Sequence, residues 1–248
     1  MRTRRFFVDL ACAITSLCVV SMALAQSETQ FTKGNQEYAA GHFKEAIENY
    51  ESLVQSHEWA PNLFYNLGNS YFRENDFGRA ILNYERALAL DRHHPESAAN
   101  LQIVHDETRA LELAPTWTQR FLHSVDATQY AITASVAFWI GAFSLVVIFF
   151  SQRRRRAAIV FSILSLSIFA IAVAAAYSSE SSAKTLAIVI RENVTARLAT
   201  ADNAGSVLAL PAGSEIKILS ERGDWVYAEL PNNLRGWIPS KSAEQVQL

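Results

Sequence analysis

Cysteine is nearly absent from this 248-residue chain, and its two cysteines, Cys12 and Cys18, both lie close to the amino terminus. The rest of the chain can therefore form neither a disulfide nor a thiolate metal site. The sequence also lacks the phosphate-binding loop GxxxxGK[ST], the zinc motif HExxH and the nucleophile motif GxSxG. We therefore expect no catalytic residue, no cofactor and a protein that is not an enzyme.

Four residues could serve as metal ligands, namely His93, His94, His105 and Asp106. No ligand spacing recurs among them, whereas structural metal sites show characteristic spacings. We interpret the first two residues as part of a solvated turn and the last two as a helix surface. The sequence predicts no metal site.

Charged side chains are absent from two long segments, residues 131–150 and 157–177. About 20 helical residues span the roughly 30 Å hydrocarbon core of a membrane. Such length without charge favours two transmembrane helices over a buried helical pair of a soluble protein. Residues 151–156 are too few to recross the membrane, and arginine-rich loops stay in the cytoplasm. We expect a hairpin with both outer ends outside the cytoplasm and a cytoplasmic loop that contains Arg153, Arg154, Arg155 and Arg156.

The amino terminus independently indicates the same orientation. Three arginines among the first five residues precede an apolar run that ends in Ala-Leu-Ala at residues 23–25, the pattern of a secretory signal peptide over residues 1–25. Asp9 interrupts the run, so an uncleaved anchor is the alternative. In both cases the following chain is exported. We expect a two-pass membrane protein with both large domains outside the cytoplasm.

The exported parts carry an excess of negative charge. Three arginines lie in the signal segment and four in the loop, so that 15 basic and 23 acidic residues remain outside, a net charge of −8. A surface of that sign repels phosphate polymers, so we expect no nucleic-acid partner. Proteins and neutral glycans are more suitable partners.

A 34-residue repeat follows the signal segment. Five residues recur at this interval, because Gly34, Phe43, Ala46, Ile47 and Tyr50 return as Gly68, Phe77, Ala80, Ile81 and Tyr84. Period and residue types resemble those of tetratricopeptide repeats, which place two helices in each unit. We predict units over residues 28–61 and 62–95 in an all-α domain of residues 26–113. Two units bury little surface, so residues 96–112 are expected to cap the stack or to open a third unit.

In tetratricopeptide repeats the first helix of each unit lines a concave face, so the resemblance implies a binding surface. Asparagine amides can pair with the backbone of an extended peptide, and aromatic rings can pack its side chains. The alternative is that some of these side chains are structural. The predicted peptide-binding surface comprises Phe31, Asn35, Tyr38, Tyr65, Asn66, Asn69, Phe72 and Arg73.

Residues 114–129 connect the repeats to the hairpin. Trp117, Phe121, Leu122 and Val125 recur at helical spacing, and tryptophan is favoured at membrane interfaces. We predict an amphipathic helix that lies in the plane of the outer interface. Packing against the repeat domain would explain the same stripe, and both alternatives stay open.

From residue 184 onward the apolar residues follow a period of two. Turn sequences separate several short strands, and such a tail predicts a small barrel. The Gly and Trp motifs at residues 223–226 and 236–239 resemble those of bacterial SH3-like domains, and the likeness covers residues 184–248. The resemblance implies binding of cell-wall peptides or protein segments through Trp225, Tyr227 and Trp237. Alternatively, the tryptophan rings fill the barrel.

The order of the parts is more specific than any single part. A signal, a tetratricopeptide pair, an amphipathic segment, a hairpin with a basic loop and an SH3-like tail together resemble the BatE-type proteins of bacterial aerotolerance operons. The resemblance implies a bacterial inner membrane with both large domains in the periplasm. It also implies partners among membrane and envelope proteins, including von Willebrand A domain proteins of the same operon. We expect a multidomain membrane scaffold or adaptor with an all-α repeat domain, a two-helix transmembrane hairpin and an all-β SH3-like barrel. The alternative is a membrane anchor that binds the cell wall (peptidoglycan).

Overall fold

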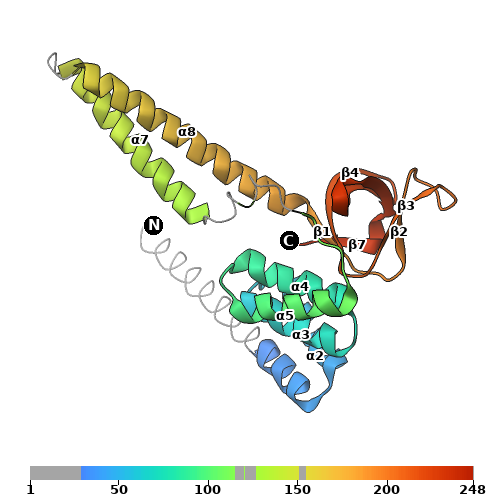
Figure 1. Ribbon diagram of the computed structural model, residues 1–248. Helices are drawn as coiled ribbons and strands as arrows, with labels where there is room; N and C mark the ends of the chain where they lie inside the picture. Colours follow the sequence, from blue (N-terminus) through green and yellow to red (C-terminus); the bar gives the residue numbers. More distant parts are fainter. Residues whose placement is uncertain (1–28, 115–119, 121–126, 151–154, 248) are drawn as a thin grey trace, which may run out of the picture.

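The computed structural model describes residues 29–114, 120, 127–150 and 155–247 (Figure 1). The predicted signal peptide lies outside this part of the chain, as do Arg153 and Arg154. The described residues form a stack of antiparallel helices, a long helical hairpin and an antiparallel sheet. The apolar stripe of the predicted interfacial helix also lies outside the described residues, namely Trp117, Phe121, Leu122 and Val125.

The repeat domain comprises residues 29–108. A helix over residues 29–40 packs on α2 (Phe43–Gln55), α3 (Pro61–Arg73) packs on α4 (Phe77–Leu90), and α5 (Pro95–Thr108) follows. Proline opens both α3 and α5, where its missing N–H has no helical partner to lose. The Asp76 carboxylate caps α4 by accepting from the Arg79 backbone N–H at 3.2 Å.

Close contact between a glycine and a tyrosine explains the 34-residue period. A Cβ atom on Gly34 would lie 2.5 Å from Tyr50 Cε1, and one on Gly68 would lie 2.7 Å from Tyr84 Cε1. Both tyrosines are only 1% exposed. Each unit thus needs a residue without a side chain on its first helix, because the tyrosine ring of its second helix fills that space.

Helix α5 takes the place of the first helix of a third unit. Asn66 Nδ2 donates to Asn35 Oδ1 at 2.8 Å, and Asn100 Nδ2 donates to Asn69 Oδ1 at the same distance. The two bonds span the same sequence separation of 31 residues. The α3–α5 contact therefore repeats the contact between the helix of residues 29–40 and α3.

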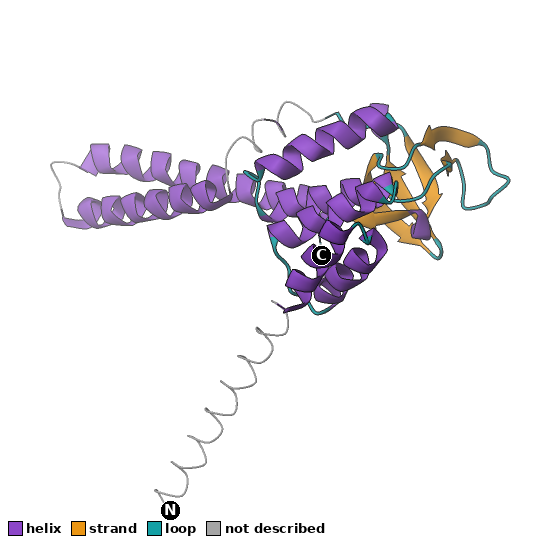
Figure 2. Ribbon diagram, turned by 90° about the horizontal axis from the view of Figure 1, so that it is seen from below, coloured by secondary structure: helices purple, strands orange, loops and turns teal. Residues whose placement is uncertain are grey.

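Helices α7 (Ala127–Phe150) and α8 (Arg155–Thr185) form an antiparallel hairpin that projects away from the rest of the chain (Figure 2). Both are long and apolar enough to cross a membrane. Small residues line their contact, where the Ser165 hydroxyl lies 3.5 Å from a Cβ position on Gly141 and donates to the Ala137 carbonyl. Large apolar side chains face outward instead, such as Phe149 and Phe150, which are 83% and 87% exposed.

The β domain comprises residues 186–247, and its seven-stranded antiparallel sheet has the order β3-β2-β6-β5-β4-β1-β7. The strands and their bounds are β1 (Leu186–Val189), β2 (Val194–Arg197), β3 (Ser206–Leu210), β4 (Glu215–Arg222), β5 (Trp225–Glu229), β6 (Arg235–Pro239) and β7 (Ala243–Gln245). Strand β1 begins directly after α8, so the hairpin continues into the sheet without a linker.

The prediction of a closed barrel is wrong, because the sheet stays open between β3 and β7. The physical reason lies in what covers the β1–β7 edge. Ile188 from β1 and Val246, which follows β7, are buried in the apolar cluster of the repeat domain. This edge therefore packs against helices instead of pairing with β3.

The β domain docks on α4. The guanidinium of Arg86, a residue that is 7% exposed, donates to the Glu244 carboxylate at 2.7 Å and to the Gln245 carbonyl at 3.0 Å. The segment after α5 adds backbone bonds, since Glu215 N–H donates to the Leu111 carbonyl at 2.9 Å. The two domains, which the sequence indicated as separate modules, thus form one packed body.

Candidate functional site

The predicted peptide-binding surface, called the inner face below, lies on the helix of residues 29–40 and on α3. Its asparagines are engaged within the protein. Asn35 Oδ1 accepts from the Tyr50 hydroxyl at 2.7 Å in addition to Asn66, and Asn69 Oδ1 accepts from the Tyr84 hydroxyl at 2.7 Å. Burial raises the pKa of Tyr50 to about 12, so its hydroxyl keeps the proton that it donates.

These bonds divide the amide groups of the inner face into two sets. Both lone pairs of Asn35 Oδ1 and of Asn69 Oδ1 are used, so these oxygens are not acceptors for a peptide. Their Nδ2 groups, and the Oδ1 atoms of Asn66 and Asn100, make none of these four hydrogen bonds. The sequence did not indicate Asn100, although its 34-residue spacing from Asn66 was a signal that could have found it.

The aromatic side chains of the inner face are all partly buried. Phe31 packs on Tyr50 with ring centroids 5.9 Å apart, and Tyr65 packs on Tyr84 at 6.2 Å and on His94 at 5.2 Å. Each ring thus rests on the second helix or on the following unit. The remaining two rings, Tyr38 and Phe72, pack on Phe43 and Phe77 at 5.3 and 5.7 Å.

Arg73 ends the row of residues on α3. It is exposed, and its Cζ atom lies 4.8 Å from the centroid of the Phe43 ring. This cation–π contact holds the side chain over the Phe43 ring, which also packs on Tyr38, without neutralising its charge. The inner face therefore combines partly exposed aromatic rings with a positive charge at one end.

The predicted aromatic surface of the β domain lies on the face of the sheet opposite its core. Val226, Ala228 and Ile238 are buried on one side of β5 and β6, whereas Tyr227 and Trp237 point to the other side. These two residues are paired across the strands, with ring centroids 5.0 Å apart. Trp225 precedes them on the same face, and all three are partly buried. The three rings thus lie on the face of the sheet opposite its core, here called the ledge, and do not fill the interior of a barrel.

The four possible metal ligands named from the sequence do not come together. His94 caps α5 by accepting from Ser97 N–H at 3.2 Å, and its Nε2 lies 3.0 Å from Asn62 Oδ1. His93 and Asp106 are exposed. His105, by contrast, is buried at the junction with the β domain.

A cavity of about 160 Å³ lies between the repeat domain and the carboxyl-terminal tail. Its wall includes Tyr71, whose hydroxyl donates to Glu51, and two arginines. Arg86 pairs with Glu244, and the Arg79 guanidinium lies 2.7 Å from Asp76 Oδ2. Because these charges are already paired, we assign no ligand to this cavity.

Comparison with known families agrees with the geometry of the second unit. A family model described as tetratricopeptide repeat matches residues 61–94. Comparison with curated proteins gives no match. The matched residues include Gly68 and Tyr84, whose contact defines the unit. The chain thus contains a tetratricopeptide repeat, a fold that serves as a protein–protein interaction module and is not in itself enzymatic.

Proposed function

We propose that this protein is a membrane-anchored adaptor that binds a protein or peptide partner on the inner face of its repeat domain. The observation that carries the proposal is the tetratricopeptide repeat at residues 61–94 with partly exposed rings on its first helix. An extended peptide would pack its apolar side chains on Tyr38, Tyr65 and Phe72. Arg73 would pair with an acidic group of that peptide.

The docking of the β domain supports this choice of surface. The sheet packs on α4, which is the second helix of its unit, and on the end of α5, and so leaves the inner-face residues of α3 for a partner. Helix α8 extends eight residues beyond Tyr177, about 12 Å at the rise of an α-helix, before β1 begins. In the proposed arrangement this extension holds both domains at a set distance from the bilayer.

We place both domains outside the cytoplasm, in an envelope complex of the aerotolerance type, with membrane proteins such as those carrying von Willebrand A domains as partners. The arginine loop and the signal segment support the topology, and the order of the parts supports the context. The topology is tested in a chain with Cys12 and Cys18 replaced by serine. A new cysteine at exposed Asn203 should react with a membrane-impermeant maleimide in spheroplasts, whereas one at Gln152 should react only after lysis. The opposite pattern contradicts the topology.

Partner binding is tested by site-specific photocrosslinking in native membranes. A benzophenone amino acid at Tyr65, on the inner face, should crosslink one or more envelope proteins. The matched control places the same probe at Glu48, an exposed residue on α2. Crosslinks of equal yield and identity at both positions, or none at Tyr65, would contradict the inner face as the binding surface.

A second candidate function is binding of peptidoglycan through the β domain. The observation that favours it is the ledge of Tyr227 and Trp237, because stacked aromatic rings are suited to sugars and short peptides. The full chain in detergent should then sediment with purified peptidoglycan in a saturable way. Tyr227→Ala should abolish this binding, while Leu198→Ala, at a residue that is 71% exposed, should leave it unchanged. Equal loss in both variants would indicate nonspecific adhesion.

A further inference from the structure

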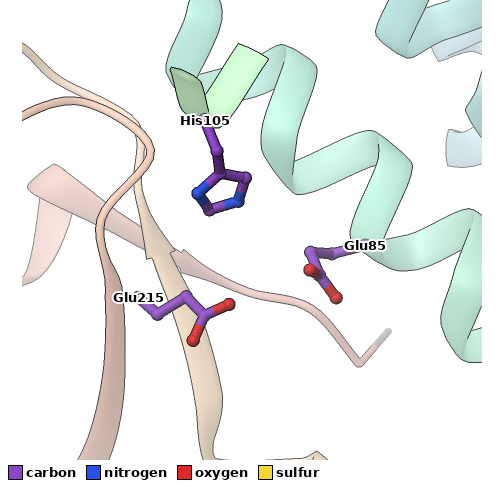
Figure 3. Close-up of side chains that lie close together, drawn as sticks. All are labelled: Glu85, His105 and Glu215. Carbon is purple, nitrogen blue, oxygen red and sulfur yellow. The ribbon is translucent and has the colours of Figure 1, made fainter. Parts of the chain in front are cut away.

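Three side chains that can ligate a metal converge where the β domain meets the repeat domain (Figure 3). They are Glu85 from α4, His105 from α5 and Glu215 from β4, and their ligand atoms all lie within 4.8 Å of one another. Figure 3 shows the imidazole ring facing both carboxylates. Glu85 and His105 come from consecutive helices of the repeat domain, whereas Glu215 follows His105 by 110 residues.

One ring nitrogen of the buried histidine lacks a hydrogen bond within the described residues. His105 is 9% exposed, and within the described residues its Nδ1 atom has no hydrogen-bond partner. The carboxylate of Glu112 lies 3.3 Å from this nitrogen, but not in hydrogen-bond geometry. A buried polar atom without a partner is unfavourable, and natural proteins seldom retain one without a reason.

The charge around the histidine is negative. Within the part of the chain that the structure describes, no lysine or arginine forms an ion pair with Glu85, Glu112 or Glu215. Burial, together with the charges of Glu215 and Glu112, raises the pKa of Glu85 to about 8. Burial also raises the pKa of Glu215. Two carboxylates placed close together in a partly buried site therefore need either a proton or a cation between them.

The preceding repeat unit provides an internal comparison. Glu51 and Tyr71 lie 34 residues before Glu85 and His105, and there the tyrosine hydroxyl donates directly to the carboxylate. One hydrogen bond thus gives both the Tyr71 hydroxyl and the Glu51 carboxylate a partner. In the second unit an imidazole replaces the phenol, and Glu215 of the β domain is added to the pair. A neutral imidazole carries one N–H donor, which is fewer than the acceptor atoms that two carboxylates present.

We propose that Glu85, His105 and Glu215 bind a divalent transition-metal ion, of the zinc or manganese type, that joins the repeat domain to the β domain. One imidazole nitrogen and two carboxylate oxygens suit such ions, whereas Mg²⁺ and Ca²⁺ prefer oxygen ligands alone. Ligands at about 2.1 Å from a shared ion lie about 3.4 Å apart, so small side-chain rotations would close the site.

The surroundings of the site fit this assignment. Leu113 N–H donates to Glu215 Oε2 at 3.0 Å and so orients that carboxylate, as outer-shell groups do in metal sites. The Glu112 side chain is 65% exposed and lies at the rim, where it could receive an ion from solvent. Binding would link α4, α5 and β4, and so would stabilise the docked arrangement of the two domains.

The test uses the full chain in detergent, stripped of metal with a chelator and then titrated with ZnCl₂, MnCl₂ or MgCl₂. We expect the metal retained after gel filtration to saturate at one zinc or manganese per chain, with no retention of magnesium. Glu85→Gln should weaken zinc binding at least tenfold. The matched control is Glu51→Gln at the equivalent position of the preceding unit, which should bind zinc like the unaltered chain.

Hydrogen exchange provides a second measurement that does not depend on any variant. Zinc should slow the exchange of the backbone amides of Leu113 and Glu215 in the unaltered chain and leave the α2 amides unchanged. Absence of saturable zinc binding by the unaltered chain would overturn the proposal and would indicate that the two carboxylates share a proton instead. Equal loss of binding in Glu51→Gln and Glu85→Gln would also overturn it.

Discussion

Gly213 is the position where one added methyl group should disturb the packing between the two domains. Its φ is +90°, and a Cβ atom there would overlap Cδ1 of Ile81, a residue of α4 that is 0% exposed. Gly223 offers a matched control in the same sheet, because its φ is +59° and nothing lies within 4 Å of a Cβ atom there. Alanine at either position must adopt a left-handed backbone, but only alanine at residue 213 must also displace the buried Ile81 side chain of α4.

The expected loss in the free energy of unfolding follows from the left-handed backbone and from the overlap with Ile81. A left-handed conformation costs a non-glycine residue about 1–2 kcal/mol, and both variants incur this cost. Overpacking of a filled core costs about 1–3 kcal/mol, and only Gly213→Ala incurs it. The free energy of unfolding should therefore fall by about 1–2 kcal/mol in Gly223→Ala and by about 2–5 kcal/mol in Gly213→Ala, as the sum of the two terms.

The assay is urea unfolding of the full chain in detergent, with tryptophan fluorescence as the signal. A double-mutant cycle with Ile81→Val identifies the cause, since valine lacks the Cδ1 atom that the new methyl would overlap. Ile81→Val alone should cost about 0.5–1.5 kcal/mol, yet it should recover most of the packing loss when combined with Gly213→Ala. Equal costs for Gly213→Ala and Gly223→Ala, or no recovery in the double variant, would refute the described contact.

Three further predictions concern the same packed body. Arg86→Met removes a buried guanidinium that bonds to Glu244 and Gln245 of the carboxyl-terminal tail. The backbone amide of Val246 should then exchange its hydrogen about 10- to 100-fold faster, equivalent to about 1.4–2.8 kcal/mol. An unchanged exchange rate would contradict the role of this residue. Gly68→Ala places a Cβ atom 2.7 Å from Tyr84 Cε1 and should cost about 1–3 kcal/mol in urea unfolding, but less in a Tyr84→Leu background. Burial raises the pKa of Glu85 from 4.5 to about 8, so in chelator-containing buffer the stability should fall as the pH rises from 6.5 to 8, because the unfolded chain has already released this proton and the folded chain has not. The neighbouring imidazole, whose pKa burial lowers from 6.5, acts in the opposite direction mainly at and below the lower end of that range. Glu85→Gln should flatten the profile in the same titration.

Features that depend on contacts near in sequence could be predicted from the residue pattern. Gly68 and Tyr84 belong to one unit and repeat Gly34 and Tyr50 at an interval of 34 residues, and this interval alone indicated the stack of helices. The length and the lack of charge of residues 131–150 and 157–177 likewise indicated the two long apolar helices.

The pattern was less informative about what each side chain does. It placed Asn35 and Asn69 on the inner face, but it could not show that their carboxamide oxygens are already occupied by tyrosine hydroxyls and neighbouring asparagines. It also grouped His105 with His93 and His94, which lie one helix turn or more before it in the same region of the sequence, whereas the fold groups it with Glu85 and Glu215.

The sequence by itself determined the helical units, the apolar hairpin and the short strands, because each arises from periodicity within a few tens of residues. Only the tertiary structure decided that the sheet stays open, that its edge packs on α4, and that two glutamates meet a buried histidine. Arg86 and Glu244 are 158 residues apart, and no sequence period links positions so distant. Such contacts depend on how two finished domains fit against each other, which is a property of their surfaces and not of any local pattern.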